Sequence, residues 1–305
     1  MKTVVTVTEH KPHWLVLGAS GFIGTALVAA LRAAGRSVTG STRTRQALAN
    51  SAPDSLCLDL WKMGSLVEPL RQLKPDVIVN ATGHDGSRPA AEWGPFYAQT
   101  TRHLLTAVTQ AGRLRTRVVL LGPAAECGLT PAQGATETTP DQPLTLYGQA
   151  KCAQYHIAQT FRAQGIQVVT ARIFNLLGCR QPVHLFPQSL IQRLRTEAAP
   201  VTVQQGHHLR DWLDVRDAAQ ALIHIGETAA TPDRWQVASG IGRPVAELAI
   251  ALGRLADKSI YLEPAADPQS GLWRSLGQNQ PLCQIGWRPR YDLATSLKDM
   301  WTGQS

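Results

Sequence analysis

The chain has 305 residues, a net charge of +8, 44% hydrophobic residues and 17% charged residues, the proportions of a soluble globular protein with one large domain or two coupled ones. No apolar run reaches the roughly 18 to 20 residues that span a bilayer. Residues 1–13 also lack the features of a secretion signal. We therefore expect a cytoplasmic protein without a membrane partner.

The cysteines and the positive charge narrow the classes of ligand. Five cysteines are an odd number and include no Cys-x-x-Cys pair, so we expect neither a disulfide framework nor a metal site. The positive charge suits an anionic ligand such as a nucleotide. The basic residues are scattered, apart from Arg113, Arg115 and Arg117, and we therefore expect no nucleic-acid partner.

Short apolar runs alternate with helical stretches through the first half of the chain. The run 13–17 leads into a glycine-rich loop, which is followed by a predicted helix over 26–34 and a strand over 37–40. Further strands are predicted at 56–58, 77–79, 118–121 and 167–173, and further helices near 62–73, near 96–112 and after 144. This alternation predicts an α/β fold, a Rossmann-type doubly wound parallel sheet.

Beyond residue 175 the pattern loosens. We predict helices near 187–196, after 217, near 244–256 and near 293–302, with strands at 201–203 and 235–238. The chain is expected to divide into a dinucleotide-binding domain over 1–175 and a smaller, interleaved C-terminal substrate lobe over 176–305. A strand and a helix near 204–240 are expected to return to the main domain.

Gly18, Gly21 and Gly24 form a Gly-x-x-Gly-x-x-Gly loop between the first strand and the first helix. Small residues let the backbone approach a pyrophosphate, which the free N–H groups of a helix N-terminus can bind. A tight turn alone would also use glycines, but the position of the loop after a strand and before a helix favours a dinucleotide site.

The end of the second strand indicates which dinucleotide is bound. NAD enzymes usually place an acidic residue there against the ribose hydroxyls, whereas an arginine accommodates the additional phosphate of NADP. The segment Ser41-Thr42-Arg43-Thr44-Arg45 contains no acidic residue. We therefore predict NADP rather than NAD, with Arg43 as the phosphate contact and Arg45 as the alternative.

Tyr147 and Lys151 are four residues apart, which places them on one face of the predicted helix. An ammonium near a phenol favours the phenolate and should lower the tyrosine pKa toward neutrality, where it can exchange a proton with a carbonyl or carbinol oxygen. Hydride transfer with a nicotinamide needs this chemistry. The spacing also fits a surface helix on which a lysine stem packs against a ring, but the glycine loop favours the catalytic interpretation.

Further segments match a family pattern in chain order. Besides the glycine loop and Tyr147-x-x-x-Lys151, they are Asp59-Leu60, Asn80-Ala81-Thr82-Gly83, and residues 172–178, 209–217, 235–240 and 285–291. Together they resemble the extended short-chain dehydrogenase/reductase family, which comprises sugar-nucleotide epimerases, dehydratases and reductases. Segments 172–178 and 209–217 are most similar to reductases of GDP-4-keto-6-deoxymannose.

The resemblance implies roles for individual residues. The cofactor would be bound by Gly18, Ser20, Gly21, Phe22, Ile23, Gly24, Arg43, Asp59, Leu60, Ala81, Gly83 and Lys151. The substrate would be bordered by Pro123, Glu126, Asn175 and Arg210, the last two holding a sugar nucleotide. For Arg210 and Asp211 the alternative is a local ion pair beside Arg216 and Asp217, and for Asn175 it is a loop-capping amide.

Two positions depart from the family pattern. Where the family has a serine or threonine that hydrogen-bonds the substrate oxygen, this chain has Pro123, which offers neither a hydroxyl nor an N–H. The family's asparagine in the helix after the fourth strand aligns with Tyr97, unless the register slips to Gln99. Losing one donor costs about 10² to 10³ in rate without abolishing hydride transfer. Thr145, Thr82 or a bound water are candidate substitutes.

Glu126 and Cys127 lie close to this altered position and raise two other reactions. Dehydration of a keto sugar needs an acid/base pair, and a thiol nucleophile needs a histidine or cationic partner. The sequence shows no such partner for either residue. We therefore expect neither dehydratase nor thiol chemistry.

Together these observations predict an NADP-dependent oxidoreductase that reduces a keto group on a nucleotide-activated sugar or a related small metabolite, with Tyr147 as the proton donor. The resemblance also implies a homodimer packed through helices near 96–112 and 145–164. One alternative is a sugar-nucleotide epimerase that retains its cofactor. A second, of a different class, is a non-catalytic NADP(H)-binding sensor or scaffold, which the changes at Pro123 and Tyr97 leave open.

Overall fold

The centre of the protein is a seven-stranded parallel sheet with the order β10-β6-β5-β4-β1-β2-β3. The structure is a computed structural model that describes residues 11–44, 55–83, 89–230, 232–265, 267 and 269–304. The strands of the sheet are β1 (His13–Leu17), β2 (Ser37–Thr42), β3 (Leu56–Cys57), β4 (Val77–Asn80), β5 (Arg117–Pro123), β6 (Val168–Ile173) and β10 (Arg234–Val237). The predicted doubly wound parallel sheet is confirmed.

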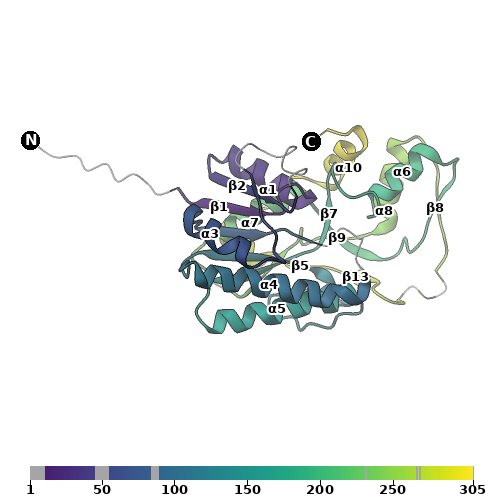
Figure 1. Cartoon of the computed structure of the whole chain (residues 1–305). Helices are drawn as coiled ribbons and strands as arrows, with labels where there is room; N and C mark the ends of the chain where they lie inside the picture. Colours follow the sequence, from purple (N-terminus) through teal and green to yellow (C-terminus); the bar gives the residue numbers. More distant parts are fainter. Residues whose placement is uncertain are drawn as a thin grey trace, which may run out of the picture.

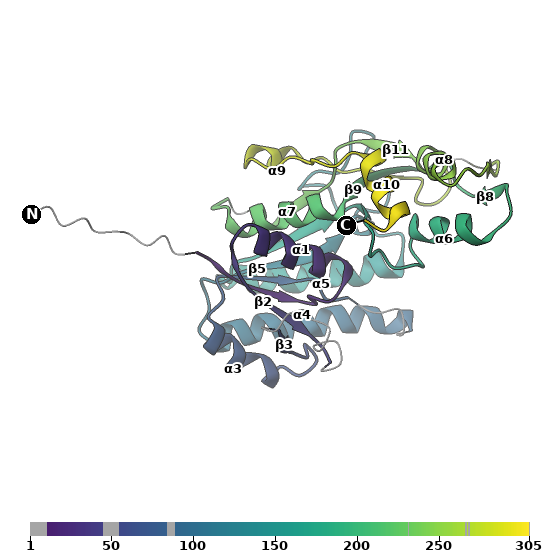
Figure 2. The same cartoon turned by 90° about the horizontal axis from the view of Figure 1, so that it is seen from above.

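Helices cover both faces of this sheet (Figures 1 and 2). On one face α1 (Phe22–Ala33) packs against α7 (Val215–Glu227), and on the other α3 (Gly64–Leu73), α4 (Trp93–Gln110) and α5 (Leu146–Ala163) lie side by side. Successive residues of β1 point to opposite faces: Trp14 joins the core beneath α1 and α7, and Leu15 joins the core beneath α3 and α4. Because both faces are covered, the strand is a continuous apolar run.

The remaining elements form a smaller C-terminal region. Two small sheets contain β7 (Asn175–Leu177), β8 (Val201–Val203), β9 (Leu209–Asp214), β11 (Gly242–Pro244), β12 (Ile260–Leu262) and β13 (Arg274–Ser275). The helices there are α6 (Gln188–Thr196), α8 (Val245–Leu255), α9 (Gln280–Gln284) and α10 (Leu293–Thr302). They enclose a core of their own, and β10 and α7 leave this region to pack with the main sheet.

The structure differs from the predicted elements in two ways. The first helix begins at Phe22 rather than near residue 26, because the last turn of the glycine loop is already helical. Sequence analysis also missed β7, β9, β11, β12, β13 and α9. These elements are short, and their residues do not follow a simple apolar alternation. Two 3-10 turns, η1 (Ala90–Glu92) and η2 (Ala124–Glu126), precede α4 and follow β5.

Candidate active site

The glycine loop lies between β1 and α1, where the order of the strands reverses. Gly18 has a φ of +79°, and a Cβ there would lie 2.9 Å from the main-chain oxygen of Ala81. A Cβ on Gly24 would collide with the Gly18 oxygen. At Gly21, which precedes α1, no side chain caps the helix, so its first N–H groups can bind a phosphate. The loop therefore fits a dinucleotide pyrophosphate.

A cavity of about 330 Å³ extends from this loop to the ends of β2 and β3. The predicted cofactor residues that line it are Gly18, Ser20, Gly21, Arg43, Asp59, Leu60, Ala81 and Gly83. Arg43 directly follows β2, whereas Arg45 lies outside the described residues. Within residues 41–44, which the structure does describe, no acidic side chain follows the strand. We call this space the cofactor cavity.

A second cavity, of about 410 Å³, adjoins the first and shares residues 81–83 with it. Six predicted site residues line it besides Ala81 and Gly83, namely Phe22, Ile23, Pro123, Tyr147, Lys151 and Asn175. The remaining lining comes mainly from the ends of β5, β6 and β7 and from the segment before α6. We call this space the substrate cavity. Ligands that filled both cavities would meet beside Tyr147 and residues 81–83.

Tyr147 and Lys151 lie in the first two turns of α5. Thr145 caps this helix by accepting a hydrogen bond from the N–H of Gly148 at 3.0 Å. A Cβ on Gly148 would collide with the main-chain oxygen of Ala125, so the glycine lets α5 approach the end of β5. The cap and the close approach together fix the position of α5, and therefore the points at which the Tyr147 and Lys151 side chains enter the substrate cavity.

The Lys151 ammonium is hydrogen-bonded away from Tyr147. Nζ donates to the main-chain oxygen of Leu121 at 2.8 Å and to Oε1 of Gln154 at 2.7 Å. Burial lowers the pKa of Lys151 to about 7, although the charge of Glu126 opposes this shift. The two acceptors stabilise the ammonium at neutral pH, and they also fix where it points.

The Tyr147 phenol has a raised pKa in this structure. Burial is the main cause, and the charge of Tyr97, a hydrogen bond with it and the charge of Glu126 add to it. The sequence-based expectation that Lys151 lowers this pKa is therefore wrong here. The lysine ammonium is directed at Leu121 and Gln154, and the pKa of Tyr147 is set by burial and by Tyr97 and Glu126. Tyr147 is accordingly a protonated donor at neutral pH, which is the state that carbonyl reduction requires.

Of the two threonines considered as replacements for the missing hydroxyl, only Thr82 lies in the substrate cavity. Its hydroxyl donates to Oδ1 of Asn80 at 2.6 Å. Thr145 does not line the cavity and serves as the α5 cap. Pro123 does line the cavity, at the end of β5. Position 123, where the family pattern has a hydroxyl, therefore lies in the substrate cavity, but its proline offers no hydrogen-bond donor.

Glu126 is buried behind the cavity wall rather than on it. Its side chain is 1% exposed and forms an ion pair with Nε of Arg172 at 3.1 Å, and Arg172 continues to Asp141 at 2.6 Å. Asp141 in turn pairs with Arg234 at 2.9 Å. Burial raises the pKa of Glu126 against the opposing charge of Arg172. This network joins η2, β6, β10 and Asp141 of the segment before α5, and it does not place Glu126 among the residues that line the substrate cavity.

Cys127 is also excluded from the chemistry by its surroundings. The residue is 1% exposed, and burial raises the pKa of its thiol to about 11. A nucleophilic thiol needs a lowered pKa and access to a substrate. The structure therefore agrees with the expectation of no thiol chemistry at this position.

Asn175 and Arg210 were both expected at the substrate, but only Asn175 lines the substrate cavity. Asn175 lines the substrate cavity while its Nδ2 donates to the main-chain oxygen of Asp211 at 3.0 Å. Arg210 does not line that cavity and donates to the main-chain oxygens of Leu209 and Leu272 at 2.9 and 2.7 Å. The Asp211 carboxylate accepts from two main-chain N–H groups, those of Ser239 and Gly240. The expected alternative of an ion pair between Arg210 and Asp211 is therefore not formed.

Sequence analysis missed Gln181, which lines the substrate cavity. Its Nε2 donates to the main-chain oxygen of Leu176 at 2.7 Å, which fixes the amide plane. Its Oε1 is buried and has no hydrogen-bond partner among the described residues. A buried acceptor of this kind is costly unless a ligand donates to it. The only signal in the sequence is its position six residues after Asn175.

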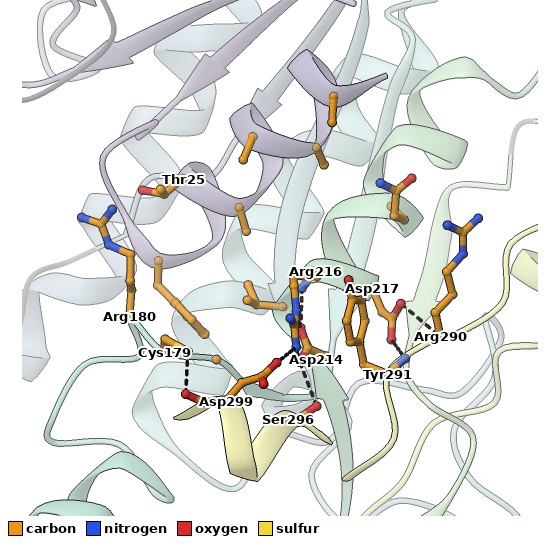
Figure 3. A pocket seen from close by; sticks show the side chains of 18 residues that line it. Thr25, Cys179, Arg180, Asp214, Arg216, Asp217, Arg290, Tyr291, Ser296 and Asp299 are labelled. Atoms are coloured by element: carbon orange, nitrogen blue, oxygen red, sulfur yellow. Dashed lines mark hydrogen bonds and ion pairs between the residues drawn. The ribbon is translucent and has the colours of Figure 1, made fainter. Parts of the chain in front are cut away.

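A third cavity, of about 440 Å³, lies between α1, α7 and α10 and shares Phe22 with the substrate cavity (Figure 3). Arg216 at the start of α7 bonds Asp214 and Asp299, each at 2.8 Å, and its guanidinium lies 3.6 Å from the ring centroid of Tyr291. Asp217 accepts from the N–H groups of Arg290 and Tyr291. The second half of the matched segment 209–217 therefore connects the C-terminal segment to the start of α7.

The fold, the glycine loop and the paired cavities define an NAD(P)-dependent enzyme of the extended short-chain type. A family model, the NAD dependent epimerase/dehydratase family, matches residues 14–238. The chain belongs to this family, whose enzymes modify sugar nucleotides.

Individual relatives agree with this assignment. The dTDP-6-deoxy-L-talose 4-dehydrogenase (NAD(P)(+)) of Kitasatospora kifunensis is 29% identical over 306 residues, which cover 95% of each chain. UDP-glucose 4-epimerase of Thermus thermophilus, solved with NAD, has a TM-score of 0.79 at 23% identity and covers 96% of this chain and 100% of its own. RMD from Pseudomonas aeruginosa, solved with NADPH, has a TM-score of 0.78 at 22% identity and covers 96% and 99%.

The part of the chain that the structure describes has no candidate membrane span and no candidate metal cluster. None of its helices is both long and apolar enough to cross a membrane. No group of three or more histidine, cysteine, aspartate and glutamate side chains there is placed to hold a metal ion.

Proposed function

We propose that this enzyme reduces a keto group on a nucleotide-activated sugar or a related small metabolite, with NADPH as the cofactor and Tyr147 as the proton donor. The observation that carries the proposal is that Tyr147 lines a cavity that joins the cofactor cavity at residues 81–83. A 4-dehydrogenase acting on a dTDP-linked deoxysugar is among the relatives, which supports a related substrate.

The bound cofactor would supply the hydride, and the protein would supply the rest. Tyr147, which its raised pKa keeps protonated at neutral pH, would donate its proton to the carbonyl oxygen as the hydride is transferred. Lys151 would bind the nicotinamide ribose from its fixed position beside Leu121. Asn175 would hold the sugar nucleotide, since it lines the substrate cavity.

The choice of NADP rests on Arg43. It lines the cofactor cavity immediately after β2, where the 2′-phosphate of NADP would lie. Replacing Arg43 by alanine should weaken NADPH binding about 10- to 100-fold, the equivalent of one or two charge-assisted hydrogen bonds. Binding of NADH should change little. Equal losses for both cofactors would count against NADP.

The reaction itself is tested with NADPH and a panel of 4-keto sugar nucleotides. Oxidation of NADPH with one panel member, and its loss in Tyr147→Phe, would support the proposal. Cofactor that survives purification, with turnover that depends on its oxidised form, would favour the epimerase alternative. Tight NADPH binding without oxidation across the panel would favour the sensor or scaffold.

We also propose a cytoplasmic homodimer packed through α4 and α5. These two helices lie side by side on one face of the sheet (Figure 1), and the family resemblance implies this surface. All five cysteines are free, which suits a reducing compartment. Light scattering should give twice the mass of one chain, and a charged substitution on the outer face of α4 should reduce it to one.

A further inference from the structure

Tyr97 of α4 contacts both members of the catalytic pair. The Nζ of Lys151 lies 4.0 Å from the centroid of its ring, and its ring centroid is 6.1 Å from that of Tyr147 at an interplanar angle of 67°. A hydrogen bond also joins the Tyr97 and Tyr147 side chains. Tyr97 is 3% exposed and lines the substrate cavity. Its place is therefore fixed by packing, and it reaches the point where the proton is transferred.

The Tyr97 hydroxyl also faces the cofactor side of the cavity. A Cβ built on Gly83 would lie 3.7 Å from this oxygen. Gly83 belongs to the segment that the two cavities share. A carbonyl group reduced beside residues 81–83 and protonated by Tyr147 would consequently lie within reach of a second phenol.

Other hydroxyl groups are less well placed to donate a hydrogen bond to a substrate carbonyl oxygen. Thr82 lines the cavity, but its hydroxyl proton is already donated to Asn80 at 2.6 Å. Thr145 is outside the cavity and caps α5. Pro123 has no hydroxyl, although it stands where the family pattern expects one. The two departures from the family pattern, Pro123 and Tyr97, line the same cavity.

We propose that the two departures compensate: the Tyr97 hydroxyl takes over from the one missing at position 123 and donates a second hydrogen bond, beside Tyr147, to the substrate carbonyl oxygen. Each phenol has a single proton to donate, so the bond between Tyr97 and Tyr147 is replaced when a carbonyl oxygen enters between them and accepts from both. The ring of Tyr97 meanwhile packs against the Lys151 ammonium, which has already used two of its three donors on Leu121 and Gln154. The inference rests on the proposed function, because it requires a carbonyl substrate.

The first test is Tyr97→Phe, which removes the hydroxyl and keeps the ring on Lys151. We expect kcat to fall about 10²- to 10³-fold, the usual effect of losing one donor to a developing oxyanion, with little change in the Kd of NADPH. Full retention of kcat would overturn the proposal. A matched control is Tyr155→Phe on α5, where the lost hydroxyl donates to Asp233 at 2.6 Å and the ring packs on Arg234 at 3.5 Å. It should leave kcat unchanged.

The second test is rescue. Adding Pro123→Ser to Tyr97→Phe should restore at least tenfold of the lost kcat, because it returns a hydroxyl from the end of β5. The same substitution in the parent chain should have a much smaller effect. A structural role for Tyr97 would not be rescued from position 123. If a folded double variant, with serine or with threonine at 123, stays as slow as Tyr97→Phe, the compensation is refuted.

A third measurement needs no substrate and separates this inference from the proposed function. The titratable groups that act on Tyr147 are Tyr97 from α4 and Glu126 from η2. The phenolate absorbance of Tyr147, taken as the difference between the parent and Tyr147→Phe, should titrate at a lower pH once the Tyr97 hydroxyl is removed, because the bond with that hydroxyl raises the pKa of Tyr147. An unchanged titration would show that the two phenols are not bonded. Absence of turnover with every panel substrate would instead reject the proposed function.

Discussion

The Lys151 ammonium donates to the main-chain oxygen of Leu121, which ties the lysine of α5 to the end of β5. The bond places a positive charge beneath the substrate cavity and fixes it to the sheet rather than to Tyr147. It also explains how the lysine remains buried, since Gln154 provides a second acceptor. The charge is nevertheless close to titration, because burial lowers the pKa of Lys151 to about 7.

This titration should govern the binding of an anionic cofactor. Below a pH of about 7 Lys151 carries its charge, and above it the charge is progressively lost, so the Kd of NADPH should rise with pH through the neutral range by up to about tenfold per pH unit. In Lys151→Met the Kd should be higher and should lose this dependence. Fluorescence titration of NADPH between pH 6 and 9 measures both effects. The exposed Lys62 provides the control, since Lys62→Met should keep the pH dependence of the parent.

Gly24 should be essential for the shape of the cofactor loop. An added Cβ would collide with the Gly18 oxygen and lie 2.9 Å from the Cα of Ala19, so the loop must open. We expect Gly24→Ala to raise the Kd of NADPH at least about tenfold and to destabilise the fold by about 1 to 3 kcal/mol. Thermal unfolding with and without NADPH separates the two effects.

The matched control for the glycine is Gly94 in the first turn of α4. Nothing lies within 4 Å of a Cβ built there. Gly94→Ala should be neutral or stabilise the protein by up to about 1 kcal/mol, because alanine is the better helix former. If both variants behaved alike, the close approach at Gly24 would not be what requires a glycine.

The main sheet was predictable because its strands are buried on both faces and therefore appear as apolar runs. β9 was not, because its sequence Leu-Arg-Asp-Trp-Leu-Asp has neither a continuous apolar run nor a regular alternation of apolar and polar residues. The Asp211 carboxylate in this strand is fully buried and accepts from the N–H groups of Ser239 and Gly240. Those partners are 28 and 29 residues away along the chain. A local sequence pattern contains no information about hydrogen-bond partners so far away along the chain, and these partners are what stabilise the buried carboxylate.

The site was predictable to the extent that local spacing determines it. The glycine loop and the pair Tyr147 and Lys151 are each set by a single turn or helix. The direction of a long side chain is not local: Glu126 turns to Arg172, 46 residues away, and Arg210 turns to Leu272, 62 residues away. The expected effect of Lys151 on Tyr147 was wrong for the same reason, because the acceptor that directs the lysine lies on another element.

Gln181 should bind the substrate through its free acceptor. Its Oε1 is buried without a partner, so a ligand hydroxyl or N–H that donates to it would relieve an unfavourable burial. In Gln181→Met the KM should rise about 5- to 50-fold, equivalent to about 1 to 2 kcal/mol, and kcat should change much less. The free protein should be nearly as stable as the parent, because the methionine removes an unsatisfied group together with the bond to Leu176. A fall in kcat at unchanged KM would contradict a binding role.

Arg216 should be the residue that attaches the C-terminal helix α10 to the main domain. It bonds Asp214 and Asp299, and Asp214 also accepts from the hydroxyl of Ser296 in α10 at 2.8 Å (Figure 3). Asp214 is 2% exposed, so Arg216→Met would leave a buried charge without its cation and should cost about 3 kcal/mol. Asp299→Asn removes only the more exposed partner and should cost about 1 kcal/mol or less, an effect that salt screens.

Urea unfolding and limited proteolysis of the C-terminus test this attachment together. Arg216→Met should lower the free energy of unfolding and expose α10 to cleavage, whereas Asp299→Asn should do so weakly. The control pair is the partly exposed Arg243 of β11 and Glu247 in the first turn of α8, which lie four residues apart along the chain. Glu247→Gln should cost no more than about 0.5 kcal/mol. If Arg216→Met were as mild as this control, the stability of α10 would have to come from its apolar contacts with α8, and the ion pairs beside the third cavity would be incidental to it.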